Sequence, residues 1–321
     1  MLQYSLRRIL GMIPLLFLTS IVVFSLAKFM PGDPFGGEID PSNTNPEYIE
    51  EMREKLGYND PIPIQYIRWV TNFVQGDFGH STAHKIPVFD LIVDRLPNTI
   101  FLAIVSLIIT YIFAFAMGMY SGRKPYTWGD NLIAGYNYVG LAIPSFVAGI
   151  IAIYFFSFQL GWFPFAGSVE VGLQPGTWDY YVSRMHHVLL PALILGLMGT
   201  ASYTQFLRND VIENSRKDFV RTARAKGTSE SAIYNKHILR NSMIPLITFL
   251  GFDIATLIGG AVITETIFTY PGIGLLFLES VDRRDYAVLM TITMLLSFLT
   301  LLGNLIADLL YGIVDPRIRL G

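Results

Sequence analysis

Few residues of this chain have the type and spacing that chemistry requires. The 321 residues include no cysteine, which excludes thiolate nucleophiles, thiolate metal sites and structural disulfides. His186 and His187 are adjacent, but a zinc-like site needs three or four ligands, and an anchor at the membrane interface is the interpretation we favour. The sequence has no Gly-x-x-x-x-Gly-Lys-Ser/Thr segment to cradle phosphates. We therefore predict no catalytic, metal-binding or cofactor-binding residue in this chain.

Asp253 is the ionisable residue that lies deepest within an apolar run. An ionisable side chain near the centre of a bilayer costs about 2.5–3.5 kcal/mol on insertion scales, so its presence calls for a reason. One interpretation is that Asp253 lines a translocation path and faces water in one conformational state. The other is a hydrogen bond or a buried pair between helices. Glu265 and Asp308 lie nearer the ends of apolar runs, and for them we favour the structural interpretation.

A polar, basic segment lies between two strongly apolar runs. We expect Asp218 to cap a short helix, on which Arg221 and Arg224 share one face. Gly227 can end that helix in the left-handed conformation, and Ser229 can cap a second helix. An ordinary basic loop on the inner side of a membrane would explain the charges but not this helix-glycine-helix arrangement. The segment therefore indicates a surface built to contact another protein.

The elements that position these residues are membrane helices. Hydrophobic residues make up 52% of the chain and charged residues 15%, with a mean hydropathy of +0.46, whereas soluble domains carry about 25% charged residues. A helix needs about 20 apolar residues to cross the hydrocarbon core. Six runs satisfy this length: 9–29, 99–120, 138–158, 188–207, 244–267 and 287–314. We predict an all-α integral membrane protein with a single domain over residues 1–321 and an uncleaved first helix.

The distribution of positive charge predicts the orientation. Fourteen Lys and Arg residues flank the spans on the side of the N-terminus, against nine on the other side. The richer side is cytoplasmic by the positive-inside rule, so we expect both termini and the loop 209–243 in the cytoplasm. The net charge of −2 gives no reason to expect nucleic acid as a partner. The compartment that follows is a cell membrane, with lipid as an obligatory partner.

The external segment 30–97 is long enough to fold by itself. We expect a short helix that starts after Pro46 and ends at Gly57, because proline favours helix starts and glycine favours helix ends. The segment has eleven acidic residues against five basic ones. It is either a solvated cap or a docking surface for an external partner.

The basic segment resembles a known motif, the EAA loop of bacterial ABC importer permeases. Its general pattern is Glu-Ala-Ala, three residues, Gly, nine residues, then Ile-x-Leu-Pro. Ala223, Gly227 and Leu239 occupy matching positions. The chain departs from the general pattern at Arg221, Thr222, His237 and Arg240. These departures are the form expected in the oligopeptide, dipeptide and nickel branch of the family.

The resemblance covers nearly the whole chain. Further matching motifs lie, in order, at residues 6–8, 29–34, 65–66, 76–79, 95–99, 143–146, 160–164, 259–262, 265–266, 270–274, 285–286 and 315–317. Gly32-Asp33-Pro34 and the long external loop resemble the B-type subunit more than its C-type partner. The resemblance implies a type I ABC importer permease fold with six transmembrane helices and a long folded loop after the first.

The resemblance also implies partners and a mechanism. A second, C-type permease would complete the membrane pore, and two cytoplasmic ATPases would bind ATP and Mg. An extracellular or periplasmic binding protein would deliver the substrate to the bacterial inner membrane. The loop around Gly227 would be the coupling helix, which sits in a cleft on an ATPase subunit. Its contact residues would be Arg221, Thr222, Ala223, Arg224, Ala225, Lys226 and Gly227.

Three questions stay open at the level of sequence. Oligopeptides or dipeptides are the expected substrates, with nickel, sugars or glutathione as alternatives within the same family. A secondary transporter or channel working alone would show internal repeats and a charge relay, but the sequence has no visible repeat and one deeply placed acid. A membrane enzyme would need paired carboxylates or histidine clusters within the spans, and we find none in the sequence.

Overall fold

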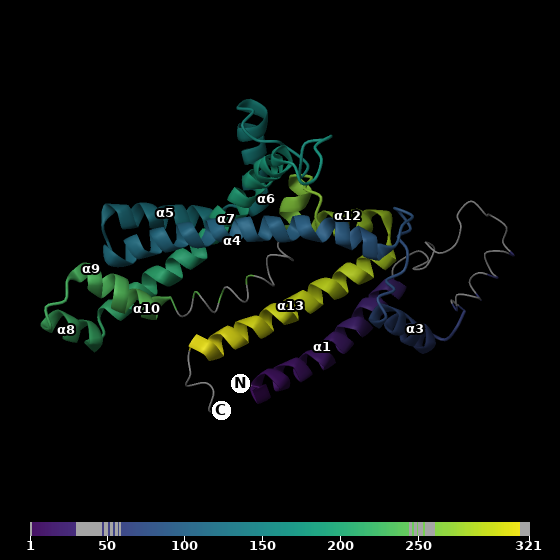
Figure 1. Cartoon of the computed structure of the whole chain (residues 1–321), viewed down its shortest axis with the longest axis horizontal. Helices are drawn as coiled ribbons and strands as arrows, with labels where there is room; N and C mark the ends of the chain where they lie inside the picture. The colour runs from purple at the N-terminus through teal and green to yellow at the C-terminus, as the bar shows by residue number, and fades with distance from the viewer. Residues whose placement is uncertain are drawn as a thin grey trace.

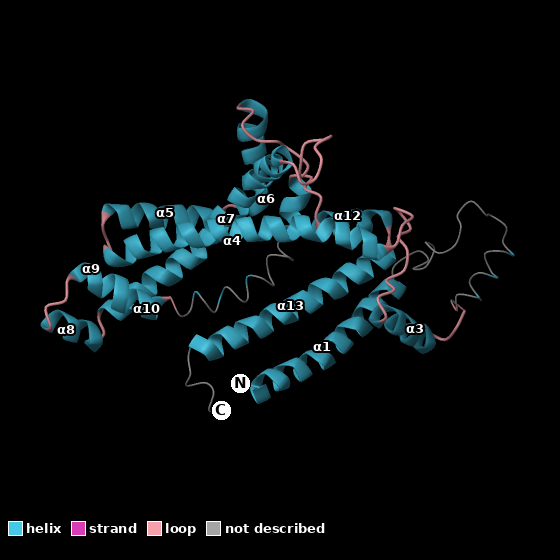
Figure 2. Ribbon diagram, in the orientation of Figure 1, coloured by secondary structure: helices cyan, strands magenta, loops and turns pink. Residues whose placement is uncertain are grey.

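The computed structural model describes residues 2–29, 47, 51, 54, 57, 59–243, 246, 249, 253 and 261–314. These residues are helical or in connecting loops, apart from one isolated antiparallel bridge between His80 and Pro87. In this described part of the chain, four helices are long and apolar enough to cross a membrane: α1 (Leu2–Phe29), α4 (Val88–Arg123), α7 (Trp178–Ser215) and α13 (Tyr286–Val314). The described part of the chain is thus all-α, and it forms layered helix pairs (Figures 1 and 2).

Helices α4 and α7 form the central pair, and α5 (Trp128–Ala142) packs beside α7. Small residues let the two long helices approach closely, as in many membrane bundles. A Cβ atom on Gly122 would lie 2.6 Å from Val211, and one on Gly196 would lie 2.7 Å from Ile109. Larger residues at either position would push the helices apart.

The second pair is formed by α1 and α13, which run side by side. Phe24 of α1 packs with Tyr286 and Met290 of α13 in a buried cluster. Helix α3 (Ile62–Val74) lies across the end of this pair, and its Trp69 contributes to the same cluster. Short helix α12 (Ile273–Arg283) connects to α13 and packs against it and against α4.

The helices differ in several places from the expected spans. Helix α4 begins at Val88, eleven residues before the expected start at residue 99, because Pro97 is accommodated inside the helix. Helix α7 extends beyond both ends of 188–207, and Thr177 caps its start by accepting a hydrogen bond from the Tyr180 N–H. Residues 88–97 of the expected external loop are therefore helical.

The expected third span, 138–158, is not one straight helix. Helix α5 ends before Pro144, and the chain continues as α6 (Ser145–Ala152) and the π-helical segment η1 (Ile153–Gln159) at an angle of 100°. Proline lacks an N–H donor and disfavours helical geometry in the residue before it, and Ile143 is accordingly extended. Within the described residues, four helices qualify as spans, and the number of spans is five if this bent pair counts as one. Most of the expected fifth span and the helix expected at 47–57 lie outside the described residues.

Candidate functional site

The basic segment forms a helical hairpin at one end of the molecule. Helix α8 (Asp218–Ala225) is followed by a turn and by three short helical segments, α9 (Glu230–Ala232), η2 (Ile233–Ile238) and α10 (Leu239–Ser242). We call residues 218–242 the hairpin. The helix begins one residue earlier than expected, because Lys217 occupies the cap position and Asp218 lies in the first turn. An acidic residue in that turn is favoured by the helix dipole, and its carboxylate lies 3.4 Å from Arg221.

Gly227 ends α8 as the sequence predicts. Its φ is +76°, in the left-handed region. The Thr228 N–H donates to the Ala223 carbonyl at 3.1 Å, and the Gly227 N–H donates to the Arg224 carbonyl at 2.9 Å, which is the Schellman pattern. A Cβ atom at Gly227 would meet nothing within 4 Å. The preference for glycine within this chain is therefore conformational rather than steric.

Polar contacts close the turn of the hairpin. The Ser229 hydroxyl accepts a hydrogen bond from the Ala232 N–H at 3.4 Å, which confirms Ser229 as a helix cap. The Arg224 guanidinium donates to both carboxylate oxygens of Glu230, at 2.6 and 3.1 Å. This hydrogen bonding lowers the pKa of the Glu230 carboxyl. Both side chains are exposed, so the pair orders the turn while leaving it accessible.

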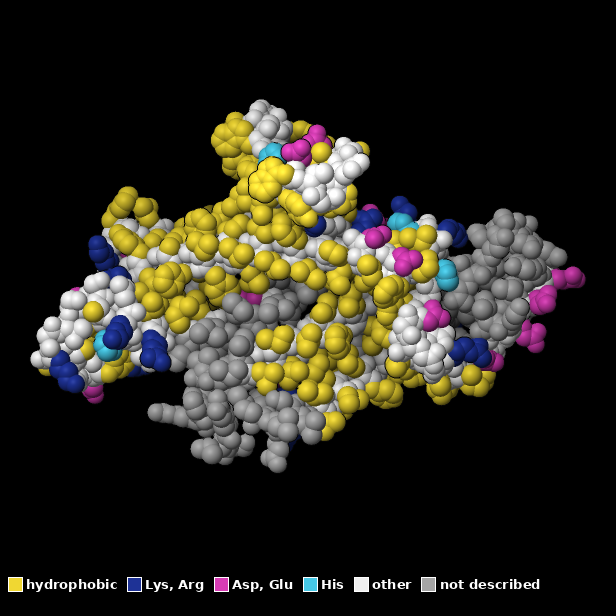
Figure 3. All heavy atoms as spheres, in the orientation of Figure 1, with side chains coloured by type: hydrophobic (Ala, Val, Ile, Leu, Met, Phe, Trp, Pro, Cys, Tyr) yellow, Lys and Arg dark blue, Asp and Glu magenta, His cyan; other side chains and the backbone are white. Residues whose placement is uncertain are grey.

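One face of the hairpin is buried against the long helices. Val220 and Ala223 of α8 pack with Ile233 and Ile238 of η2. Leu207 and Val211 of α7, Met119 of α4 and Leu246 complete the same cluster. The opposite face of α8 is open, and Lys and Arg side chains gather at this end of the molecule (Figure 3). The exposed residues of the expected contact set are Arg221, Thr222, Arg224, Ala225, Lys226 and Gly227. Ala223 instead faces the protein's own core.

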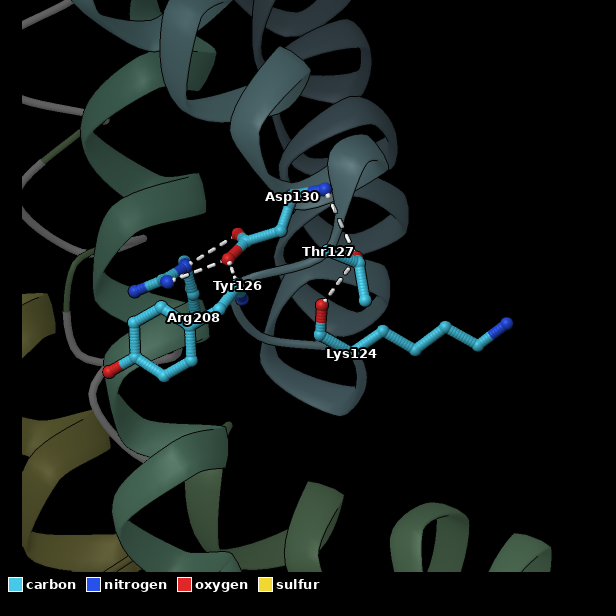
Figure 4. Close-up of polar contacts among 5 residues, drawn as sticks. All are labelled: Lys124, Tyr126, Thr127, Asp130 and Arg208. Atoms are coloured by element: carbon cyan, nitrogen blue, oxygen red, sulfur yellow. Dashed lines mark hydrogen bonds and ion pairs between the residues drawn. The ribbon is translucent and has the colours of Figure 1, made fainter.

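An ion pair with a buried carboxylate fixes the helices that support the hairpin. The Arg208 guanidinium of α7 donates two hydrogen bonds to the Asp130 carboxylate of α5, at 2.7 and 2.8 Å (Figure 4). Asp130 is 1% exposed, and it also accepts from the Tyr126 N–H at 2.7 Å. Thr127 caps α5 at the same place. Sequence reasoning missed this pair because its members are 78 residues apart and no local pattern joins them.

A cation–π contact ties the end of α4 to the hairpin. The Arg123 guanidinium lies over the Tyr234 ring, 5.0 Å from its centroid. Together with the Asp130–Arg208 pair, this contact joins α4, α5, α7 and η2 at one end of the molecule. The hairpin is thus mounted on the long helices rather than attached as a loose loop.

Asp253 lies at the junction of three parts of the chain. It is 7% exposed, and Tyr111 of α4 donates to its Oδ2 atom at 2.6 Å. Tyr203 of α7 donates to its Oδ1 atom. The two rings are 5.4 Å apart, and Tyr111 also packs against the core of the hairpin. Asp253 therefore joins both central helices next to the cluster that supports α8.

The other acids near span ends have structural contacts. Glu265 is fully buried and accepts from Thr99 Oγ1 at 2.6 Å. It also accepts from the N–H groups of Gly274 and Leu275, at 2.7 and 3.1 Å, so its carboxylate caps the start of α12. Asp308 pairs with Arg8 at 2.9 Å. These contacts agree with the structural interpretation of both residues.

The two adjacent histidines bind backbone carbonyl groups. A ring nitrogen of His186 lies 2.7 Å from the Trp162 carbonyl, and one of His187 lies 2.8 Å from the Ser183 carbonyl. Among the residues that the structure describes, no three His, Cys, Asp or Glu side chains are grouped to hold a metal ion. His186 thereby fastens the loop after η1 to α7.

The long apolar helices are those of a membrane-spanning protein, and the basic hairpin is mounted on them at one end. Residues 114–320 match the family described as binding-protein-dependent transport system inner membrane component. Residues 1–103 match the family of N-terminal membrane components of such systems. The chain belongs to this family of ABC transporter permeases, as its sequence motifs predict.

Several relatives match over their full length. The oligopeptide transport system permease protein AppB of Bacillus subtilis is 43% identical over 320 residues, covering 99% of this chain and 100% of AppB. The glutathione transport system permease protein GsiC of Escherichia coli K12 is 37% identical over 319 residues, 99% of each chain. A probable peptide ABC transporter permease of Sinorhizobium fredii is 34% identical, covering 98% of this chain and 99% of that one.

A solved structure has a related fold. A chain of the methionine ABC transporter MetNI, in an inward-facing conformation, superposes with a TM-score of 0.54 at 17% identity. The match covers 70% of this chain and 96% of that chain. Over the matched part, the helices are therefore arranged as in this ABC transporter chain.

Proposed function

We propose that this chain is the B-type permease subunit of an ABC importer that moves oligopeptides or dipeptides across a bacterial inner membrane. The observation that supports the proposal is the hairpin, which has an exposed basic face and a core continuous with the long helices. Relatives named for oligopeptide and glutathione transport support a peptide as the substrate class. The binding protein would select among such peptides before they reach this chain.

In this proposal the permease has six spans, with both termini and the hairpin in the cytoplasm. A C-type permease completes the pore, and two ATPase subunits bind ATP and Mg. The binding protein docks on the outer side, where the segment between α1 and α4 would lie. This chain itself has no nucleotide-binding motif in its sequence and depends on its partners for hydrolysis.

The hairpin would convert closure of the ATPases into movement of the spans. A cleft on an ATPase receives the exposed face of α8, with Arg221 and Arg224, together with Lys226 directly after the helix. The buried face, with Val220 and Ala223, transmits the displacement to α7 and α4 through their shared cluster. A densely packed cluster is suited to this role because protein interiors are stiff and transmit strain.

Asp253 would take part in the path that opens. In the described conformation two tyrosine hydroxyls satisfy its carboxylate. Rotation of α4 against α7 would separate these donors, and water in the opened path would then replace them. Asp253 thus links α4 to α7 by hydrogen bonds in the described conformation, and it lines the translocation path in the open one.

Substitution of Gly227 tests the coupling role. Gly227→Asp adds bulk and negative charge where an ATPase must approach, and we expect ATP-driven peptide uptake into proteoliposomes to fall at least tenfold while the complex stays assembled. Gly176→Asp is the matched control, because Gly176 also has a positive φ (+92°) and no atom within 4 Å of an added Cβ. Gly176 lies just before the start of α7, whereas the hairpin follows the end of α7. Normal uptake by Gly227→Asp would refute the coupling role.

The competing function, a transporter or channel that works alone, makes a different prediction. If it held, the purified chain would transport solute without any ATPase. Our proposal requires that ATPase subunits and a second permease purify with the chain from its native membrane.

A further inference from the structure

A cavity of about 500 Å³ opens between α1 and α13, at the end of the pair where α1 begins. Arg7 and Arg8 of α1 and Asn304 and Asp308 of α13 form its polar part. Its remaining walls are apolar and include Leu15 and Leu301, which lie further along the same helices. The cavity is distinct from the hairpin and from the Asp253 site.

The polar part of the cavity lies where α1 enters the membrane. Arg7 and Arg8 directly precede the apolar run 9–29, so the two arginines lie at the start of the first span, and Asp308 of α13 pairs with Arg8 there. Leu15 is eight residues beyond Arg7, about 12 Å along a helix that rises about 1.5 Å per residue. The cavity therefore extends from the level of the lipid headgroups into the hydrocarbon region.

The charge of the cavity favours an anion. Among the described residues that line the cavity, two guanidinium groups face one carboxylate, and the contact between Arg8 Nη1 and Asp308 Oδ2, at 2.9 Å, holds Arg8 beside the cavity. Guanidinium groups match phosphate oxygens in geometry and stay charged in apolar surroundings. Basic pockets between membrane helices are known to receive acidic headgroups.

We propose that this cavity binds an anionic glycerophospholipid. Its phosphate lies against Arg7 and Arg8, the Asn304 amide donates to the headgroup, and an acyl chain runs along Leu15 and Leu301. Free phosphate would satisfy the arginines but would leave the apolar walls exposed. The proposal requires that α1 and α13 span a membrane, and it does not depend on the transported substrate or on the ATPase.

Two variants separate the charge from the shape of the site. Arg7→Gln removes one positive charge, and Arg216→Gln, an exposed position after α7, is its control. Gly11→Leu fills the cavity without changing any charge, because a Cβ atom at Gly11 would meet nothing within 4 Å. Gly135→Leu in α5 is its control, since that position is equally open.

The test is native mass spectrometry of the complex after extraction from vesicles with equal amounts of phosphatidylglycerol and phosphatidylcholine. We expect at least fivefold preferential retention of phosphatidylglycerol by the unmodified protein and by both controls. Arg7→Gln and Gly11→Leu should each bring the ratio close to one. Equal retention of the two lipids by the unmodified protein would overturn the proposal. So would unchanged ratios in both variants, or thermal stabilisation by inorganic phosphate equal to that by phosphatidylglycerol.

Discussion

At the scale of residues, the hairpin depends on a few side chains with separate tasks. Gly227 supplies a left-handed turn, Arg224 and Glu230 close it, and Val220 anchors it to the core. The Asp130–Arg208 pair has a different task, because it holds α5 against α7 beneath the hairpin. Asp130 is nearly inaccessible, so its charge depends on Arg208 and on the hydrogen bond from the Tyr126 N–H.

Removal of Arg208 therefore has a predictable cost. Arg208→Gln leaves the Asp130 carboxylate buried without its cation, and breaking a buried pair in this way costs about 3–5 kcal/mol. We expect the free energy of unfolding in detergent to fall by roughly that amount. Arg208→Lys keeps the positive charge and should recover part of this lost free energy. The recovery should be incomplete because one of the two hydrogen bonds is lost. Arg216 is exposed, so Arg216→Gln is the control. If Arg208→Gln lowered the free energy of unfolding no more than this control does, the pair would not be structural.

At the scale of elements, the contacts of Asp253 join α4 to α7. Each of the two tyrosines donates to a different carboxylate oxygen, and the rings lie side by side. Hydrogen bonds between membrane helices average about 0.6 kcal/mol, with about 1.7 kcal/mol as the largest measured value. The tie is thus strong enough to bias a conformational equilibrium but weak enough to break during a transport cycle.

Substitutions at this site separate the structural role of Asp253 from its role in the translocation path. Tyr111→Phe and Tyr203→Phe should each lower the free energy of unfolding by about 0.6–1.7 kcal/mol. The double variant should lose more than the sum of the two single losses, because both oxygens of Asp253 then lack these donors.

Asp253→Asn keeps the shape of the side chain and removes the charge. We expect it to lower peptide uptake about tenfold with little change in thermal stability; unaltered uptake would restrict Asp253 to the structural role.

The same elements show how far sequence reasoning reaches. Local rules identified the turn at Gly227 and the cap at Ser229, because both depend on neighbouring residues alone. Pro144 explains why α5 ends, but the 100° bend that follows depends on what packs around it. The start of α4 at Val88 was missed because Pro97 sits inside the helix. The Asp130–Arg208 pair arises only when α5 and α7 meet, so no local pattern could reveal it.

At the scale of the whole molecule, the helices separate two ends with different contacts. One end carries the hairpin and the Asp130–Arg208 pair. Towards the other end, Glu265 caps α12, and Asp285 accepts hydrogen bonds from Ser81 and from the Ala83 N–H. Helices α4 and α7 connect the two ends (Figure 1). In the proposed mechanism, these continuous helices would carry a displacement of the hairpin towards the end where Glu265 lies.

The contact between the hairpin and an ATPase is the central claim, and site-directed cross-linking tests it most directly. The chain has no native cysteine, so Lys226→Cys introduces a single thiol at the exposed turn. We predict that a bifunctional thiol reagent joins this position to a partner ATPase in the purified complex, and that ATP changes the yield. Gly176→Cys, before the start of α7, should give no such product. Equal products from the two positions, or none from Lys226→Cys in an assembled complex, would contradict the account.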